Sequence, residues 1–211
     1  MKNILSEIEK TGIVPVVKLN DANKAIPLCN ALLAGGINVA EITFRTACAP
    51  DIIKAIASSC PNMIVGAGTI INVEQAKKAI DCGAKFIVSP GYNSEIVKFC
   101  QSQNIAVIPG CITPTEIMQA IADGLDTVKF FPAKEFGGLA TMKSLSAPFS
   151  GIRFMPTGGI SLDNLKEFAS AKFVIACGGT YMVKENLINE ENYEEITRLS
   201  KLSTDIIKEV K

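Results

Sequence analysis

The chain contains no histidine among its 211 residues, and this absence narrows the chemistry that it can perform. Without histidine there is no Ser-His or Cys-His nucleophile pair, no imidazole proton shuttle and little scope for the common catalytic zinc sites. Carboxylates are also not clustered at the spacing of metal ligands, so we expect neither a metal nor a cofactor. Proton transfer is left to Glu, Asp, Lys and Tyr side chains.

Net charge and long apolar runs are lacking as well. The 21 basic and 21 acidic residues cancel, so no whole-molecule field attracts nucleic acid or an anionic membrane. No stretch approaches the ~18 uninterrupted apolar residues of a membrane span. The first ten residues, MKNILSEIEK, alternate charged and apolar side chains and do not form a targeting segment. We expect a soluble, cytoplasmic protein without a nucleic-acid or membrane partner, in which any anion site is local.

Disulfide and zinc-binding patterns are missing too. The seven cysteines are odd in number and scattered, and none forms a C-x-x-C pair. This distribution argues against a disulfide framework and against a structural zinc site. We therefore expect reduced thiols, most of them in the core.

What the chain does have is a repeated strand-and-helix unit. Short apolar, β-branched runs recur roughly every 20 to 26 residues, and each is followed by a turn and an amphipathic helical pattern. The runs are IVPVVK (13–18), VAEITF (39–44), MIVGAG (63–68), FIVSPG (86–91), AVIPGC (106–111), TVKFFP (127–132), RFMPTGG (153–159) and VIACGG (174–179). Eight such units predict an α/β fold, a (β/α)8 TIM barrel. An open doubly wound sheet is the alternative, because strand count does not prove closure.

The repeat is not interrupted by a linker or a change of composition. We therefore predict a single domain over residues 1–211, with a short N-terminal helix at 2–10, the barrel at about 13–185 and a C-terminal helical segment at about 190–210. Asn72 and Thr113 precede helical patterns as N-caps, and Pro114 stands at a first helical position.

In a TIM barrel the active site lies at the C-terminal ends of the strands, and unusual residues fall there. Glu41, Thr43 and Arg45 alternate along the second strand and so share one face. A structural ion pair that closes the barrel is the alternative explanation of this pattern. In the sixth strand, Lys129 shares a face with Phe131 and points inward if its neighbours face the helices.

An inward lysine has a chemical use that a solvated one lacks. Burial disfavours the ammonium form, so the neutral amine becomes a nucleophile that can attack a ketone and form an iminium ion. The iminium draws electrons from an adjacent breaking C–C bond without a metal. Glu41, across the barrel mouth, is the candidate to move protons. The simpler alternative is that Lys129 extends to solvent.

Two glycine pairs end the last two strands. PTGGIS (156–161) and CGGTYM (177–182) stand where barrels of this type often bind phosphate through backbone N–H groups. Thr69, after GAGT (66–69), can orient a carboxylate or carbonyl, or can simply complete a tight turn. Lys18, after the first strand, is either a second anion-binding cation or a solvated side chain.

The ordered set VPVVK, EITFRT, VGAGT, SPG, IPG, VKFFPA, PTGGI and CGGTYM, over about residues 8–185, resembles the 2-keto-3-deoxy-6-phosphogluconate (KDPG) and 4-hydroxy-2-oxoglutarate (KHG) aldolase family. E-x-T-x-R together with K-F-F-P-A is the most distinctive part. The resemblance implies a homotrimeric (β/α)8 class I aldolase, a lyase that cleaves KDPG into pyruvate and glyceraldehyde 3-phosphate. Cleavage of KHG into pyruvate and glyoxylate is a second implied activity.

The resemblance also implies roles for single residues. Lys129 becomes the Schiff-base lysine and Glu41 the general acid and base. The implied substrate contacts are Arg45, Thr69, Pro90, Phe131 and Lys18, and the implied phosphate contacts are Gly158, Gly159, Gly178, Gly179 and Thr180.

The chain also departs from the family pattern. Thr180-Tyr181 stands where many members have Ser-Trp, and Lys18 where many have arginine, which leaves the preferred substrate open. Two rival functions remain on the same barrel: a non-covalent phosphosugar isomerase or epimerase, and a non-enzymatic phosphometabolite-binding protein.

Overall fold

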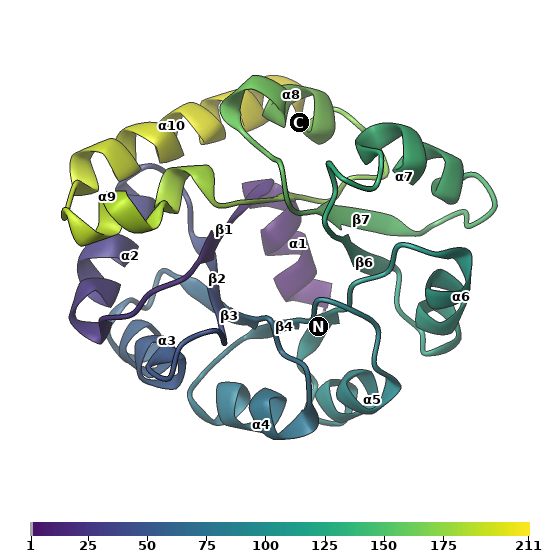
Figure 1. Ribbon diagram of the computed structural model, residues 1–211, viewed down its shortest axis with the longest axis horizontal. Coiled ribbons are helices and arrows are strands. Elements are labelled where there is room, and N and C mark those ends of the chain that lie inside the picture. The colour runs from purple at the N-terminus through teal and green to yellow at the C-terminus, as the bar shows by residue number, and fades with distance from the viewer. Residues whose placement is uncertain (1) are drawn as a thin grey trace.

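The computed structural model describes residues 2–211, which form a ring of parallel strands surrounded by helices (Figure 1). The strands are β1 (Ile13–Val17), β2 (Val39–Thr43), β3 (Ile64–Gly68), β4 (Phe86–Val88), β5 (Ala106–Ile108), β6 (Thr127–Phe130), β7 (Arg153–Pro156) and β8 (Cys177–Gly179). Six of them pair in the order β5-β4-β3-β2-β1-β8, and β6 pairs with β7.

Two seams join these sheets into a closed barrel. Between β5 and β6, the Lys129 N–H donates to the Pro109 carbonyl oxygen at 2.8 Å, and the Cys111 N–H donates to the Lys129 carbonyl oxygen at 2.9 Å. Between β7 and β8, the Ile175 N–H donates to the Phe154 carbonyl oxygen at 2.9 Å. The predicted (β/α)8 barrel is therefore confirmed, and the open-sheet alternative is wrong.

The helices pack outside the ring and follow the strands in alternation (Figure 1). They are α2 (Ala25–Ala34), α3 (Ala49–Ser59), α4 (Val73–Asp81), α5 (Ser94–Ser102), α6 (Pro114–Ala122), α7 (Gly138–Ser146) and α8 (Leu162–Ala169), with α9 (Glu185–Asn189) and α10 (Tyr193–Val210) after β8. Short 3-10 turns, η1 (Ala22–Lys24) and η2 (Tyr181–Val183), complete the set. None of the helices among residues 2–211 is both long and apolar enough to cross a membrane.

The predicted caps start two of these helices. The Asn72 side chain accepts the Gln75 N–H at 2.8 Å at the start of α4. At the start of α6, Thr113 and Glu116 form a capping box, in which the Glu116 carboxylate accepts the Thr113 N–H at 2.9 Å. These contacts satisfy N–H groups that a helix leaves without a partner in its first turn.

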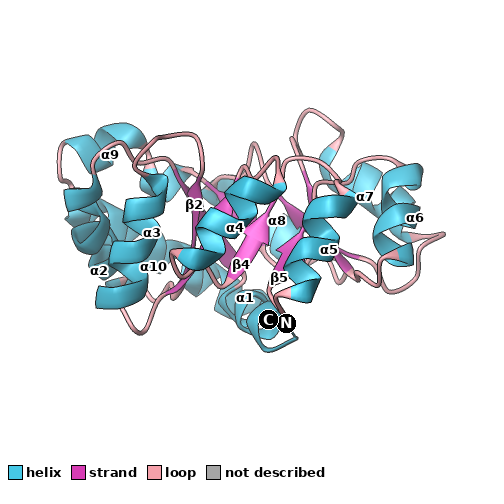
Figure 2. Cartoon of the chain, turned by 90° about the horizontal axis from the view of Figure 1, so that it is seen from below, coloured by secondary structure: helices cyan, strands magenta, loops and turns pink. Residues whose placement is uncertain are grey.

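The apolar core has two layers. The larger layer lies between the strands and the outer helices, and a smaller one fills the barrel interior. Helix α1 (Lys2–Thr11) closes the barrel at the N-terminal ends of the strands, where Ile8 is fully buried against a cluster that includes Val14, Val39 and Phe86. Figure 2 shows α1 below the strands, with both chain ends near it. The opposite end of the barrel is left for the site.

Candidate active site

A cavity of about 220 Å³ opens at the C-terminal ends of the strands. It brings together residues from seven strands or the segments after them. The predicted site residues in its lining are Glu41, Arg45, Thr69, Pro90, Lys129, Phe131, Gly158, Gly159, Gly178 and Thr180. Lys18 and Gly179, also predicted, lie outside this lining. The lining further includes Thr157, which we did not single out from the sequence.

Lys129 and Glu41 form the floor of the cavity. The Lys129 Nζ lies 3.7 Å from the Glu41 Oε1, and the two side chains are 6% and 0% exposed. Lys129 extends inward from β6, as its alternation with buried Val128 and Phe130 requires. It does not extend to solvent, so the structure favours the inward alternative for this lysine.

The Glu41 carboxylate occupies space that a glycine leaves open. A Cβ at Gly68, on the neighbouring strand β3, would overlap the Glu41 Oε1 and the carbon that carries it. Neither carboxylate oxygen has a hydrogen-bond partner within the described chain. A buried carboxylate oxygen without a hydrogen bond is costly, and both oxygens can accept a hydrogen bond from a ligand that enters the cavity.

Phe131 lies between the floor and the rim. Its ring centroid is 5.0 Å from the Lys129 Nζ, and 39% of the residue is exposed. An aromatic face at this distance attracts a positive charge placed at the position of the nitrogen. Phe131 therefore serves as a pocket wall that also favours positive charge at the floor.

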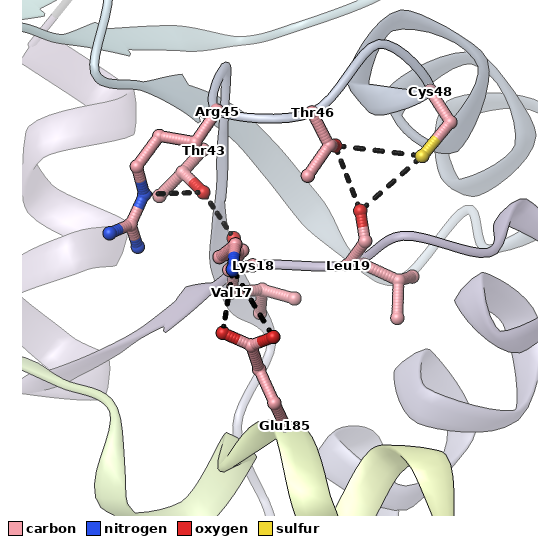
Figure 3. Close-up of polar contacts among 8 residues, drawn as sticks. All are labelled: Val17, Lys18, Leu19, Thr43, Arg45, Thr46, Cys48 and Glu185. Carbon is pink, nitrogen blue, oxygen red and sulfur yellow. Dashed lines mark hydrogen bonds and ion pairs between the residues drawn. The ribbon is translucent and has the colours of Figure 1, made fainter.

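Arg45 stands at the exposed rim, after β2. Its Nε donates to the Thr43 Oγ1 at 3.3 Å, and the Thr43 hydroxyl donates to the Val17 carbonyl oxygen at 2.9 Å (Figure 3). Within the described residues, no carboxylate lies within 4.0 Å of the guanidinium. Thr43 thus orients an arginine whose charge is free for an anionic ligand.

Thr69 holds an unusual backbone conformation directly after β3. Its φ of 59° lies in the left-handed region, which β-branched residues rarely adopt. Such strain persists only where the surroundings enforce it, and it is concentrated at functional sites. Here it keeps a threonine in the cavity lining at a position where glycine would fit without strain.

The glycine pairs place open backbone at the other side of the mouth. Gly158 and Gly159 have φ values of 94° and 76°, so side chains larger than hydrogen would be strained at both. Gly178 has no room for a Cβ because Thr157 packs against it. The Thr157 Oγ1 is buried and has no hydrogen-bond partner in the described chain. Its hydroxyl lines the cavity and can donate to a ligand.

Two titratable residues follow strands of the barrel but do not line the cavity, Tyr181 after β8 and Cys111 after β5. The Tyr181 hydroxyl pairs with the Ser203 Oγ at 2.5 Å on α10, and burial raises the pKa of Tyr181 to about 12. Burial, with the charge of Glu116, also raises the pKa of Cys111 to about 12. The phenol and the thiol are therefore neutral near pH 7, and Cys111 is not an activated nucleophile.

Lys18 forms an ion pair within the chain. Its Nζ donates to both carboxylate oxygens of Glu185, at 3.0 and 3.2 Å (Figure 3). Lys18 and Glu185 line a second cavity beside the first, which shares Val16, Arg45 and Thr180 with it.

Comparison with known proteins gives consistent matches. A family model described as "KDPG and KHG aldolase" matches residues 4–199. A 2-dehydro-3-deoxy-phosphogluconate aldolase of Treponema pallidum is 42% identical over 207 residues, which cover 98% of this chain and 99% of the relative.

Solved structures agree in fold. The KDPG aldolase of Legionella pneumophila, with pyruvate captured as a covalent carbinolamine intermediate, is 34% identical with a TM-score of 0.91, and the match covers 95% of this chain and 98% of that one. The enzyme of Zymomonas mobilis ZM4, with 3-phosphoglycerate, is 34% identical with a TM-score of 0.92, covering 98% and 97%.

Proposed function

This chain belongs to the KDPG and KHG aldolase family and is therefore a lyase, and from this premise we propose that it cleaves KDPG into pyruvate and glyceraldehyde 3-phosphate through a Schiff base on Lys129. The observation that carries the proposal is the buried pair at the cavity floor, with the Lys129 Nζ 3.7 Å from the Glu41 Oε1. A covalent pyruvate carbinolamine in the relative from Legionella pneumophila supports the same chemistry.

The first half of the reaction builds the electron sink. The neutral Lys129 amine attacks the C2 ketone of the substrate, and the ketone oxygen becomes the hydroxyl of a carbinolamine. The Glu41 carboxylate, whose Oε1 lies 3.7 Å from this nitrogen, first takes the proton that the lysine ammonium loses, and the resulting acid then protonates the hydroxyl so that it leaves as water. The product is an iminium ion, whose charge faces the Phe131 ring.

The second half breaks the carbon chain. A base removes the proton of the C4 hydroxyl, the C3–C4 electron pair moves toward the iminium nitrogen, and an aldehyde leaves. The remaining enamine is protonated at C3, and water releases pyruvate and the free lysine. Arg45 binds the substrate carboxylate. Thr180 and the glycine backbones hold the phosphate, and Thr69 and Pro90 complete the pocket.

Borohydride trapping tests the Lys129 role directly. The protein is incubated with pyruvate and sodium borohydride, and intact and peptide masses are measured. We expect one reduced pyruvyl adduct, on the peptide that carries Lys129. Lys129→Ala should abolish the adduct and the cleavage, whereas Lys98→Ala, which removes an exposed lysine on α5, should leave both intact.

The absence of an adduct in folded wild-type protein would refute the Schiff base. Cleavage of KDPG would then have to proceed without a covalent intermediate at Lys129. Glu41→Gln should slow turnover yet retain some imine formation, because it keeps the shape of the side chain and removes its proton-transfer capacity.

The second activity and the assembly extend this proposal. We propose that KHG is also cleaved, to pyruvate and glyoxylate. Comparison of kcat/KM for the two substrates tests this activity.

We also propose a cytoplasmic homotrimer. Seven free thiols fit a reducing compartment, and the exposed side chains of Met118 and Ile121 on α6 and of Phe136 offer apolar surface to a second copy.

A further inference from the structure

The second cavity, of about 400 Å³, adjoins the active site and carries mostly positive charge. Val16, Arg45 and Thr180 line both cavities, so the two cavities lie side by side at the barrel mouth. The second cavity adds two lysines, Lys18 and Lys184. Glu185 is the one carboxylate among its described lining residues.

Glu185 is directed at one of these cations. Lys18 follows β1 and Glu185 begins α9, and they meet because β1 and β8 are neighbours in the barrel. The Lys18 Nζ contacts both carboxylate oxygens, at 3.0 and 3.2 Å (Figure 3). The two side chains are 35% and 47% exposed, so the pair contributes little to stability. The ion pair matters more because it neutralises the charge of Lys18 at the barrel mouth.

Because of this pair, the positively charged side chains at the barrel mouth differ in whether a carboxylate neutralises them. Arg45 has no carboxylate within 4.0 Å in the part of the chain that the structure describes, whereas Lys18 is neutralised. A phosphate held at Thr180 would lie on the boundary between the two cavities. It would meet the carboxylate of Glu185 and a lysine that is already paired.

We propose that Glu185 is a specificity-determining residue that competes with the phosphate of the substrate for Lys18. The inference rests on the proposed function. A phosphate monoester carries a charge of about −1.5 to −2 at pH 7, so it either displaces Glu185 from Lys18 or is repelled by it. A substrate that lacks the phosphate does not compete for Lys18. Glu185 therefore weakens binding of phosphorylated substrates alone, and so reduces the preference for phosphorylated over unphosphorylated substrates.

The test compares KDPG with the same acid lacking its phosphate. Glu185→Gln keeps the shape of the side chain, removes its charge and releases Lys18. We expect the KM for KDPG to fall by about threefold to tenfold, because an exposed ion pair is worth a factor of about two to five and relief of repulsion adds to it. The kcat should stay within about twofold, and the KM for the unphosphorylated acid should change little.

Two variants separate this role from a general charge effect. Glu191→Gln removes one negative charge from the same segment, where Glu191 faces Lys24 at 3.5 Å and does not line the mouth, and it should leave the KM for KDPG unchanged. In a Lys18→Met background, Glu185→Gln should lose most of its effect, because the competition acts through Lys18. Glu185→Ser is a second substitution that removes the charge.

Three results would overturn the proposal: an unchanged KM for KDPG, an equal fall for both substrates, or an equal fall in Glu191→Gln. Pyruvate trapping on Lys129 is measured in the same preparations. An adduct together with an unchanged KM refutes the role of Glu185 alone, whereas no adduct in wild-type protein refutes the proposed function and this inference with it.

Discussion

Replacing Gly68 by alanine should disable the site although it replaces no proposed catalytic residue. A Cβ at position 68 would overlap the Glu41 Oε1, the same oxygen that lies 3.7 Å from the Lys129 Nζ. Glu41 is fully buried, so its carboxylate must shift within a packed interior. A shift of roughly 1 Å costs about 100-fold in rate at a catalytic group, and the overpacking costs about 1–3 kcal/mol of stability.

The assay follows pyruvate release from KDPG and the rate of borohydride-trapped adduct formation, both corrected for the folded fraction. Gly66→Ala is the matched control. It adds a Cβ on the same strand and the same face, but the nearest atoms to this Cβ would be those of the Phe86 ring in the barrel interior. It should lower stability and leave kcat unchanged.

A double-mutant cycle completes the test. In a Glu41→Gln background, Gly68→Ala should cost little additional activity, because the carboxylate that it displaces is already gone. Wild-type turnover in the single Gly68→Ala variant would show that the position of the Glu41 carboxylate is unimportant, and its assigned role would be wrong.

Two further predictions concern stability. Ile8→Ala, in the helix that closes the barrel, should lower the free energy of unfolding by about 2–5 kcal/mol in urea titrations, whereas Ile71→Ala, at a residue 59% exposed, should change it by less than about 0.5 kcal/mol; equal effects would contradict the packing of α1. For Glu116, burial alone raises the pKa, but hydrogen bonds from Ile112 and Thr113 outweigh it and hold the pKa below 4.5. Its stabilisation is therefore present above pH 4.5 and is lost as the pH falls through the lowered value, so Glu116→Ala should cost about 1 kcal/mol at pH 7 and progressively less below pH 4.5. A cost independent of pH would contradict this contribution.

The strands could be predicted from the sequence because buried parallel strands read as short apolar runs, but their ends could not. The run predicted at 106–111 ends as a strand at Ile108, since Pro109 has no N–H to continue the ladder and the next residues pair with Lys129. Closure itself depends on such isolated contacts between distant residues, which no local pattern encodes. The short helix α9 also went unpredicted.

The site was predictable where strand alternation and strand ends determine it, as for Glu41 and Lys129. Lys18 shows the limit, because its direction depends on Glu185, 167 residues away in a helix that was not anticipated. Thr157 was missed although it stands inside the quoted PTGG. It shares the inward face with Met155, a member of the barrel-interior cluster, and this alternation was the available signal.

The seam between β5 and β6 has a consequence for motion. Both backbone hydrogen-bonding groups of Lys129 take part in that seam. Its N–H donates to the Pro109 carbonyl oxygen, and its carbonyl oxygen accepts the Cys111 N–H. The backbone of Lys129, which carries the amine proposed to react, thus also joins β5 to β6 and closes the barrel. If these hydrogen bonds open, the backbone of Lys129 moves and its amine moves away from Glu41. The proposed nucleophile is therefore in position only while the β5–β6 seam is closed. Amide hydrogen exchange at Lys129 and Cys111 measures the opening of the seam and, with it, the loss of this position.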